Sequence, residues 1–366
     1  MKRILILSNH VLGLYSFRRE LITKLITVGF KVIISAPNHD KSAFFTDLGC
    51  EFIATPFNRK GINPFADIKL LFNYYRIIKN KKPNIVLSYT IKPNVYGGLA
   101  CRFLGVKYLS NITGLGSAVE NASFLQKITF LLQKIALKNA DCIFFQNKEN
   151  LDYLVKNNIV DKNKSTLLPG SGVNLDYFKI LDYPSDEIIK FVFISRIMKE
   201  KGIDYYLDAA VRLKSIYSNI EFHICGACEE DYQERLEQMQ KRGVIFYHGR
   251  MSDIREIHKI SHCTIHPTYY PEGMSNVLLE SAACARPIIT TDRSGCKEVV
   301  DDGINGYICK QKDLNDLIDK IEKFIKLPYE EKREMGLRGR KKIEKEFDRE
   351  IVIKAYFDEI DKILGK

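Results

Sequence analysis

The stretch PEGMSNVLLESAACARPIITTD, residues 271–292, decides how the second half of this chain folds. A loop that contains Gly273 leads into an apolar helix expected over 275–285, and a β-branched strand, PIITT, follows at 287–291. Another short apolar run, CTIHP, precedes the loop at 263–267. Strand, helix and strand in this order predict a β–α–β unit, whose two strands lie parallel in one sheet.

The same alternation extends outward from this unit through the whole chain. In the second half, strand-like runs lie at FVFIS (191–195), EFHIC (221–225) and VIFYHG (244–249), with helical stretches at 203–217, 230–242 and 253–260. In the first half, the runs are ILILS (4–8), KVIIS (31–35), NIVLSY (84–89), KYLSNI (107–112) and CIFFQ (142–146), with helical stretches at 16–28, 65–80, 94–103 and 121–139. This pattern predicts an α/β fold with parallel sheets covered by helices on both faces.

A cluster of Pro, Gly, Ser and Asp at 169–185 interrupts the pattern and is the expected hinge. We therefore predict two Rossmann-like, doubly wound domains, one over 1–170 and one over 171–349. The last segment is amphipathic, and a helix over 350–366 is expected to pack back on the first domain. Two such domains that face each other form a deep central cleft, the usual place for a ligand.

Composition is ordinary for a soluble globular protein and favours the cytoplasm. The chain has 366 residues, of which 28% are charged, and its first residues show no cleavable signal peptide. It has no apolar run of eighteen residues, so we expect no membrane-spanning helix. The nine cysteines are expected to be reduced. Cys225 and Cys228 form an isolated C-x-x-C pair, for which we favour simple packing over a zinc site.

The net charge of +11 is concentrated in the first half of the chain. Residues 1–175 hold 24 lysines and arginines against 10 acidic residues, whereas the rest is close to neutral. Such asymmetry indicates an anionic partner, which could be nucleic acid, a membrane surface or a phosphorylated substrate. A solvated lysine-rich surface is the alternative.

Two glutamates, Glu272 and Glu280, flank the start of the helix expected at 275–285. A helix N-terminus offers unpaired N–H groups and the positive end of a dipole, which suit a diphosphate or sugar hydroxyls. Carboxylates accept hydrogen bonds from vicinal hydroxyl pairs. The alternative is a helix with one acidic residue before it and one exposed glutamate within it.

Two cations follow the strand at 191–195. Arg196 stands at the carboxyl end of the strand and Lys201 in the next turn. An arginine fork and a lysine charge that converge on one anion would hold a phosphate well. The alternative is two loop cations in water.

The first strand–helix turn, SNHVLG at 8–13, argues against a nicotinamide-dependent dehydrogenase. It has one glycine, Gly13, where a dinucleotide fingerprint needs G-x-G-x-x-G and an acidic residue about twenty positions on. Ser16 is a candidate N-cap for the first helix.

Residues 191–292 resemble the donor-binding half of retaining glycosyltransferases of family four, which have the GT-B fold. The strings that carry the resemblance are FVFISRIMKEKG (191–202), FHICG (222–226), FYHGR (246–250) and PEGMSNVLLESAACARPIITTD (271–292), continued by EVVDDGINGYI (298–308). The resemblance implies that Arg196 and Lys201 hold the donor diphosphate, that Glu272 contacts the donor sugar, and that Glu280 holds the ribose. The catalytic set is then Glu272, Arg196 and Lys201, and the other donor-binding residues are Gly13, Gly226, Arg250, Gly273, Met274, Ser275, Asn276 and Glu280.

The first half contains SYTIKPNVYGGLACRFLGV (88–106) and NITGLGS (111–117). Both resemble members that build capsule, O-antigen or other glycan chains of bacteria on polyprenyl-diphosphate carriers. The resemblance implies an acceptor side made of His10, Thr90, Lys92, Asn94, Thr113 and Gly114, with a flexible loop at Gly114 and Gly116. Alternatively, Lys92 and Pro93 only shape a turn and Thr113 only caps a helix.

Two basic amphipathic segments, 65–83 and 124–140, suggest contact with an anionic membrane. The first carries Lys69, Arg76, Lys79, Lys81 and Lys82, and the second carries Lys127, Lys134 and Lys138. The alternative is that their apolar faces pack on the sheet while the lysines face water.

Together these features predict a metal-independent, retaining glycosyltransferase. It would move a hexose or N-acetylhexosamine from a nucleotide sugar, preferably UDP-linked, to a polyprenyl-diphosphate glycan or polysaccharide acceptor. No D-x-D string suits a metal, and no cofactor is expected beyond the nucleotide-sugar substrate. The enzyme would sit as a peripheral protein on the inner face of the plasma membrane. The alternatives are a nucleotide-sugar epimerase or hydrolase of the same architecture and, more remotely, a nucleic-acid-binding protein, although no zinc finger, helix-turn-helix or RNP-like string is present.

Overall fold

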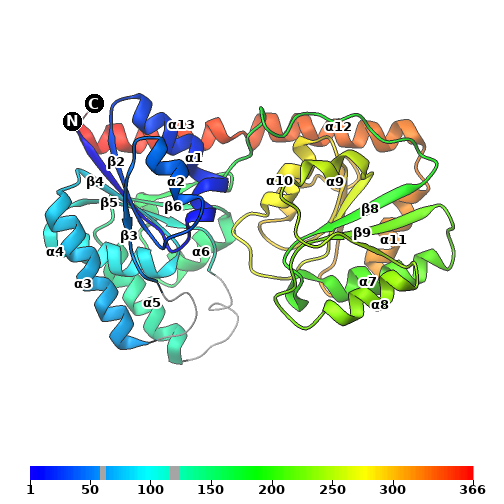
Figure 1. Cartoon of the computed structure of the whole chain (residues 1–366), viewed down its shortest axis with the longest axis horizontal. Coiled ribbons are helices and arrows are strands. Elements are labelled where there is room, and N and C mark those ends of the chain that lie inside the picture. Colours follow the sequence, from blue (N-terminus) through cyan, green and yellow to red (C-terminus); the bar gives the residue numbers. More distant parts are fainter. Residues whose placement is uncertain (58–62, 116–123, 366) are drawn as a thin grey trace. The chain divides into compact units, whose positions relative to one another are not determined.

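The computed structural model describes residues 1–57, 63–115 and 124–365, with the backbone alone at 124–127 (Figure 1). The chain divides into two compact units, each described here by itself. Unit 1 consists of Met1–Ser171 together with Glu350–Lys366, and unit 2 is Gly172–Arg349.

Unit 1 is built on a parallel sheet of seven strands in the order β3-β2-β1-β4-β5-β6-β7. The strands are β1 (Arg3–Leu7), β2 (Lys31–Ala36), β3 (Glu51–Ala54), β4 (Ile85–Tyr89), β5 (Lys107–Ile112), β6 (Cys142–Phe145) and β7 (Ser165–Leu167). The helices are α1 (Val11–Thr27), α2 (Ser42–Asp47), α3 (Pro64–Lys81), the π-helix η1 (Pro93–Gly97), α4 (Gly98–Leu104), α5 (Phe124–Leu137), α6 (Lys148–Lys156), the 3₁₀ turn η3 (Lys162–Lys164) and α13 (Arg349–Leu364).

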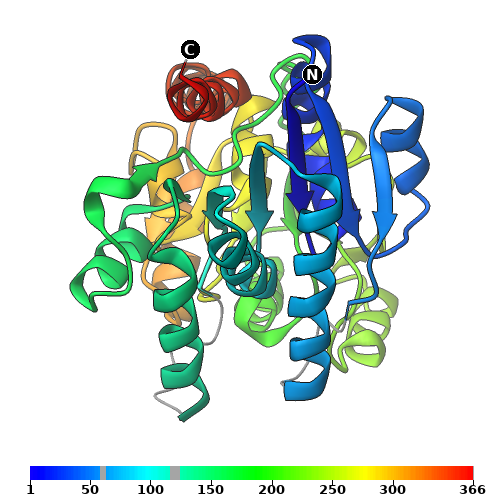
Figure 2. The ribbon, with the colours of Figure 1, turned by 90° about the vertical axis from the view of Figure 1, so that its left-hand side faces the viewer.

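Helices cover both faces of this sheet because its strands are apolar on both sides. Ile4 and Ile6 of β1 pack with α1, α2 and α13, whereas Leu5 and Leu7 pack with α3 to α6. The C-terminal helix α13 is part of the first of these layers, where the buried Tyr356 lies against Phe144 of β6 with ring centroids 4.5 Å apart. Figure 2 shows α3 and α5 extending past the carboxyl-terminal edge of the sheet.

Unit 2 has a parallel sheet of six strands in the order β10-β9-β8-β11-β12-β13. The strands are β8 (Ile189–Ile194), β9 (Ile220–Cys225), β10 (Phe246–Tyr247), β11 (Cys263–His266), β12 (Ile288–Thr291) and β13 (Gly306–Cys309). The helices are η4 (Lys199–Lys201), α7 (Ile203–Lys214), α8 (Gln233–Lys241), α9 (Arg255–Ile260), α10 (Asn276–Ala283), η5 (Lys297–Val299), α11 (Leu314–Ile325) and α12 (Tyr329–Glu346). Phe191 and Phe193 face α7, α8 and α11, while Val192 and Ile194 face α9.

The α/β class and the parallel sheets predicted from the sequence are confirmed. One local prediction is wrong: α1 does not begin at Ser16 but at Val11, because the side chain of His10 caps it by accepting a hydrogen bond from the N–H of Gly13. The short edge strands β3 and β7 were not predicted, nor were β13, α11 and α12.

In each sheet the order in which successive strands are added reverses at the first strand. In unit 1, β1 lies between β2 and β4, and in unit 2, β8 lies between β9 and β11. The connections on the two sides of such a strand run to opposite faces, which leaves a crevice at the carboxyl ends where ligands of doubly wound folds bind. The crevices between β1 and β4 and between β8 and β11 are therefore the places to look for a site.

Candidate functional site

The crevice of unit 2 holds both predicted cations and an aromatic residue that connects them. Arg196 follows β8, and its Nη1 lies 2.8 Å from Oε2 of Glu229. The ring of Tyr270, which follows β11, lies 5.6 Å from the Arg196 guanidinium and 4.7 Å from Nζ of Lys201. Both distances allow cation–π attraction. Sequence reasoning missed Tyr270, although it stands next to the PEG string.

Lys201 is held in place by a close backbone approach. Its side chain is 8% exposed and forms an ion pair with Glu272, which is 16% exposed. The next residue, Gly202, has φ +80°, and a Cβ there would stand 2.1 Å from the carbonyl oxygen of Pro267. Only glycine lets the Lys201 turn lie this close to the loop after β11. This contact brings Lys201 and Glu272 together, as the sequence predicted for one shared site.

Gly226 has a similar packing role at the end of β9. Its φ is +151°, and a Cβ would stand 1.7 Å from the carbonyl oxygen of Ser195. Its N–H donates to the carbonyl of Gly249 over 2.8 Å. Gly226 thus supports the backbone directly before Arg196. Arg250, which follows Gly249, is exposed.

The loop Gly273–Ser275 is buried and leads into α10. The N–H of Ser275 donates to the carbonyl of Gly295 over 2.7 Å, and the N–H of Gly295 donates to Glu298 over 2.7 Å. Gly295 has φ +86°, and a Cβ there would stand 2.8 Å from the carbonyl oxygen of Gly273. The loop after β12 therefore packs against the residues that precede α10 and holds them in place. Sequence reasoning missed this loop as well as Tyr270.

The first turn of α10 offers groups for a ligand. Ser275 caps the helix without a side-chain hydrogen bond. Oδ1 of Asn276 is buried and has no hydrogen-bond partner in the described parts of the chain. Met274, in contrast, is buried in the apolar cluster around α10, so its side chain serves packing.

Glu280 lies in the second turn of α10 with an unusual carboxyl group. Burial raises its pKa from 4.5 to about 7, and the positive charge of Arg349 limits the rise. A carboxylate with this pKa is strongly stabilised by hydroxyl donors, because they favour its charged form.

The crevice of unit 1 brings together fewer of the predicted residues. His10 caps α1 through Nδ1, which accepts the Gly13 N–H over 3.2 Å, so Nε2 carries the proton in the neutral ring. Gly13 thus lies in the first turn of α1, where its N–H meets the cap. Thr90, directly after β4, has φ +74°, and its Oγ1 is buried without a partner among the described residues. Strained residues of this kind persist where the surroundings impose them, often at functional sites.

Asn94 was predicted on the acceptor side, but the structure gives it a structural role. It is 1% exposed, accepts from Ser88 at 2.6 Å and donates to the carbonyl of Asn111 at 2.8 Å. These bonds join β4 to β5 and engage both the oxygen and the nitrogen of the amide. Lys92, another residue predicted on the acceptor side, forms an ion pair with Asp67 of α3, with 2.8 Å between Nζ and Oδ1.

Thr113 and Gly114 follow β5 as an irregular segment, with φ +144° at Gly114. Gly116, the other glycine of the predicted loop, lies outside the described residues. Within 1–57, 63–115 and 124–365, no group of three or more His, Cys, Asp or Glu side chains is arranged to hold a metal ion. Among the helices described, none is long and apolar enough to cross a bilayer.

Two family models match the chain in sequence. The model described as glycosyl transferases group 1 matches residues 178–342, and the glycosyl transferase 4-like model matches residues 3–147. Among curated relatives, the N,N'-diacetylbacillosaminyl-diphospho-undecaprenol α-1,3-N-acetylgalactosaminyltransferase of Campylobacter jejuni is 25% identical over 99% of both chains. The UDP-Gal:α-D-GlcNAc-diphosphoundecaprenol α-1,3-galactosyltransferase of Escherichia coli is 23% identical over 72% of this chain and 71% of its own.

Solved structures agree with these matches at the level of the fold. A glycosyltransferase from Rickettsia africae superposes with a TM-score of 0.83 at 21% identity, over 99% of this chain and 98% of its own. The Anabaena protein HepE in complex with UDP and glucose superposes with a TM-score of 0.81 at 14% identity, over 99% of this chain and all of its own.

Proposed function

Because this chain belongs to the family-four glycosyltransferases with the GT-B fold, we propose that it transfers a hexose or N-acetylhexosamine from a UDP-sugar to a polyprenyl-diphosphate-linked glycan. Unit 2 binds the donor and unit 1 binds the acceptor. The observation that carries the proposal is the cluster of Arg196, Lys201 and Glu272 at the crevice between β8 and β11. The names of the relatives from Campylobacter jejuni and Escherichia coli support the acceptor class.

In this proposal the diphosphate of the donor is the leaving group. Arg196 and Lys201 contact its oxygens and, with the N–H groups at the start of α10, stabilise the negative charge that grows as the glycosidic bond breaks. Fixed donors of this kind are worth roughly 3 kcal/mol each in a transition state. These cations serve in place of a divalent metal, which is why we propose a metal-independent reaction.

Donor binding exchanges the ion pairs that the cations form with carboxylates of the protein. The diphosphate displaces Glu229 from Arg196, a pair in which both side chains are about half exposed and therefore weakly held. It also draws Lys201 toward the phosphates, which lets the Glu272 carboxylate face the sugar. Glu272 then orients the sugar and stabilises positive charge at the anomeric carbon.

The transfer retains the anomeric configuration. The acceptor oxygen forms its bond to the anomeric carbon on the face that the diphosphate leaves, and its proton passes to the leaving phosphate oxygen. Glu280 accepts hydrogen bonds from the ribose hydroxyls. In unit 1, Thr90 and His10 stand at the crevice where the acceptor hydroxyl would bind.

The proposal also places the enzyme on the inner face of the membrane. Exposed apolar residues follow the spacing i, i+3, i+7 on α3 (Phe65, Ile68 and Phe72) and on α5 (Ile128, Leu131 and Ile135). Exposed lysines accompany both stripes. Lys81 is not one of them, because it is ion-paired with Glu51 of β3, so this lysine is a poor candidate for the predicted membrane contact.

The test is transfer from UDP-sugars to an undecaprenyl-diphosphate-linked sugar. Arg196→Ala and Glu272→Ala should each lower turnover at least a hundredfold, the usual cost of losing one transition-state donor. The anomeric coupling constant of the product reports retention. Wild-type turnover in either variant would refute the assigned roles, and sugar turnover without an acceptor would favour the epimerase or hydrolase alternative.

A further inference from the structure

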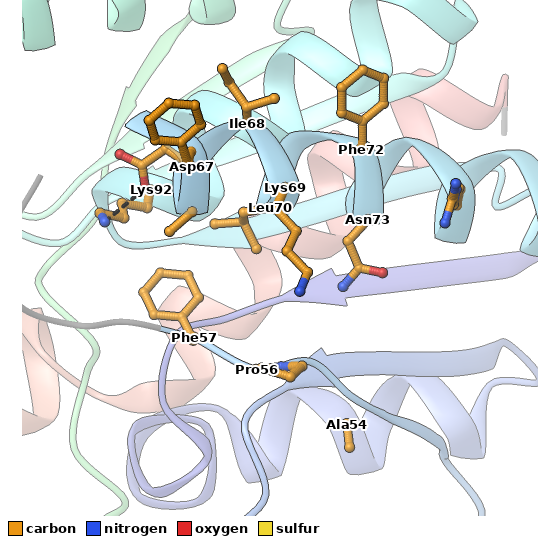
Figure 3. A pocket seen from close by; sticks show the side chains of 13 residues that line it. Ala54, Pro56, Phe57, Asp67, Ile68, Lys69, Leu70, Phe72, Asn73 and Lys92 are labelled. Carbon is orange, nitrogen blue, oxygen red and sulfur yellow. Dashed lines mark hydrogen bonds and ion pairs between the residues drawn. The ribbon is translucent and has the colours of Figure 1, made fainter. Parts of the chain in front are cut away.

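A pocket of about 1040 Å³ opens in unit 1, and none of the residues assigned above to the donor lines it (Figure 3). It lies between Ala54–Phe57, at the carboxyl end of β3, and the first turns of α3. Figure 3 shows Lys69, Leu70 and Asn73 pointing from α3 toward Pro56 and Phe57. Its volume is at the upper end of the range of about 300–1,000 Å³ found for ligand pockets.

The lining is mostly hydrocarbon and much of it is exposed. Phe65 is 86% exposed, Ile68 is 52% exposed and Phe72 is 61% exposed, and all three line the pocket. Single exposed apolar residues are common, but three on one helical stripe beside a pocket form a contiguous patch. Such patches mark surfaces that bind an apolar partner.

The charged residues at the pocket are positive in balance. Asp67, the one acidic side chain among the described lining residues, lies 2.8 Å from Lys92 and is neutralised by it. Lys69 and Arg76 also line the pocket and are exposed. Neither forms an ion pair with any described carboxylate, so both remain available to an anion.

We propose that this pocket binds the isoprenoid chain of the acceptor next to its phosphate. The proposal rests on the function proposed above and assigns a separate site for the lipid part of that acceptor. The apolar walls take the hydrocarbon, while Lys69 and Arg76 attract the phosphates.

An extended peptide is a poorer occupant of the same pocket. A bound peptide must satisfy its backbone N–H and C=O groups, since unpaired ones are costly away from water. Among the described lining residues, Asn73 carries the one neutral side chain that can hydrogen-bond. An isoprenoid chain makes no such demand.

The position of the pocket also suits an acceptor that continues toward the crevice of unit 1. The segment Ala54–Phe57 leaves the carboxyl end of β3, and Thr90 leaves the carboxyl end of β4 in the same parallel sheet. Lys92 lines the pocket and stands two residues after Thr90. A lipid held at α3 can therefore direct its diphosphate and sugar along this edge toward Thr90.

The experiment measures sedimentation of the full chain with phosphatidylcholine vesicles that contain undecaprenyl phosphate. The variant Phe65→Ser with Phe72→Ser removes two exposed aromatic side chains from the pocket and should weaken binding about tenfold or more. Phe103→Ser is the matched control, because Phe103 is 69% exposed on α4 in the same unit but does not line the pocket. This control should bind as the wild type does.

Two results would overturn the proposal. Equal losses in the control and in the double variant would indicate general adsorption of apolar side chains. Equal binding to vesicles in which phosphatidylglycerol supplies the same negative charge would indicate a membrane surface without recognition of the isoprenoid.

Stabilisation of each variant by UDP, measured as a thermal shift, separates this proposal from the proposed function. Retained stabilisation in the double variant shows that unit 2 is intact, so a loss of lipid binding then belongs to the pocket. A wild type that binds undecaprenyl phosphate but is not stabilised by UDP would refute the proposed function and leave the pocket assignment standing.

Discussion

Replacing Glu280 by glutamine tests whether α10 carries a carboxylate kept ready for a ligand. Burial raises the pKa of Glu280 from 4.5 to about 7. A group whose pKa is higher in the folded state binds more protons there than in the unfolded chain between these two values. The free energy of unfolding of the wild type therefore falls as the pH rises from 4.5 to 7, and glutamine removes this dependence.

The size of the effect follows from the shift in pKa. Each pKa unit corresponds to about 1.4 kcal/mol, so the change from 4.5 to about 7 gives roughly 3–4 kcal/mol. Near pH 4.5 the protonated Glu280 resembles glutamine, and the two proteins should be about equally stable. At pH 8 the variant Glu280→Gln should be more stable by nearly the full amount.

The assay is urea denaturation of both proteins at a series of pH values, monitored by a signal that reports the unfolding of unit 2. UDP provides the functional half of the test, because ribose hydroxyls that donate to the carboxylate favour its charged form. The affinity of the wild type for UDP should rise with pH up to about 7, and that of Glu280→Gln should be lower and flat. A stability difference that does not change with pH would refute the reasoning.

Three further predictions concern the same unit. Tyr270→Leu removes the aromatic ring that both cations contact and should raise the donor KM about five- to thirtyfold. Tyr270→Phe keeps the ring and should have the donor KM of the wild type. An unchanged KM in the leucine variant would contradict this role. Gly202→Ala, with its Cβ 2.1 Å from the Pro267 carbonyl, should lower both the melting temperature and turnover by displacing Lys201. Gly243→Ala is the control, because Gly243 also has a positive φ, +68°, but a Cβ there would have no atom within 4 Å. It should cost only about 1 kcal/mol of stability, without loss of turnover. Equal losses in both alanine variants would count against the Gly202 contact. EDTA should leave the transfer rate unchanged, and a sharp loss that Mg²⁺ restores would overturn the metal-free proposal.

The sequence predicts the central strands well and the edge strands poorly. The run ILIL of β1 is buried on both faces, so it appears as a continuous apolar stretch that only a central strand requires. In β3, with the sequence EFIA, the residues are only partly buried, and β7 has three residues. Such strands are fixed by pairing with β2 and β6, which a local pattern does not contain.

Helix starts depend in part on capping contacts, which the sequence does not always reveal. The first helix was missed by five residues because histidine is not among the usual N-caps, although its Nδ1 can accept a backbone hydrogen bond. Asn147, a usual N-cap, does start α6, but the short helix after it was not recognised.

The candidate site, like the fold, could be predicted only in part from the sequence. Arg196, Lys201 and Glu272 could be predicted because they occur in contiguous strings that follow strands. Glu229 and Tyr270 were missed because their contacts with Arg196 depend on β9 and β11 being the two neighbours of β8. The structural bonds of Asn94 were missed for a related reason, since only the pairing of β4 with β5 places Asn111 within its reach.

The central claim is that Arg196 and Lys201 grip the diphosphate of a nucleotide sugar, and calorimetric titration of UDP and of uridine tests it most directly. The wild type should bind UDP at least a hundredfold more tightly than uridine, because two charge-assisted contacts of about 1.5–3 kcal/mol each act on the phosphates alone. In Arg196→Ala the preference should fall at least tenfold, with the weak affinity for uridine retained. Equal affinities for UDP and uridine in the wild type, or a preference unchanged in the variant, would contradict the account.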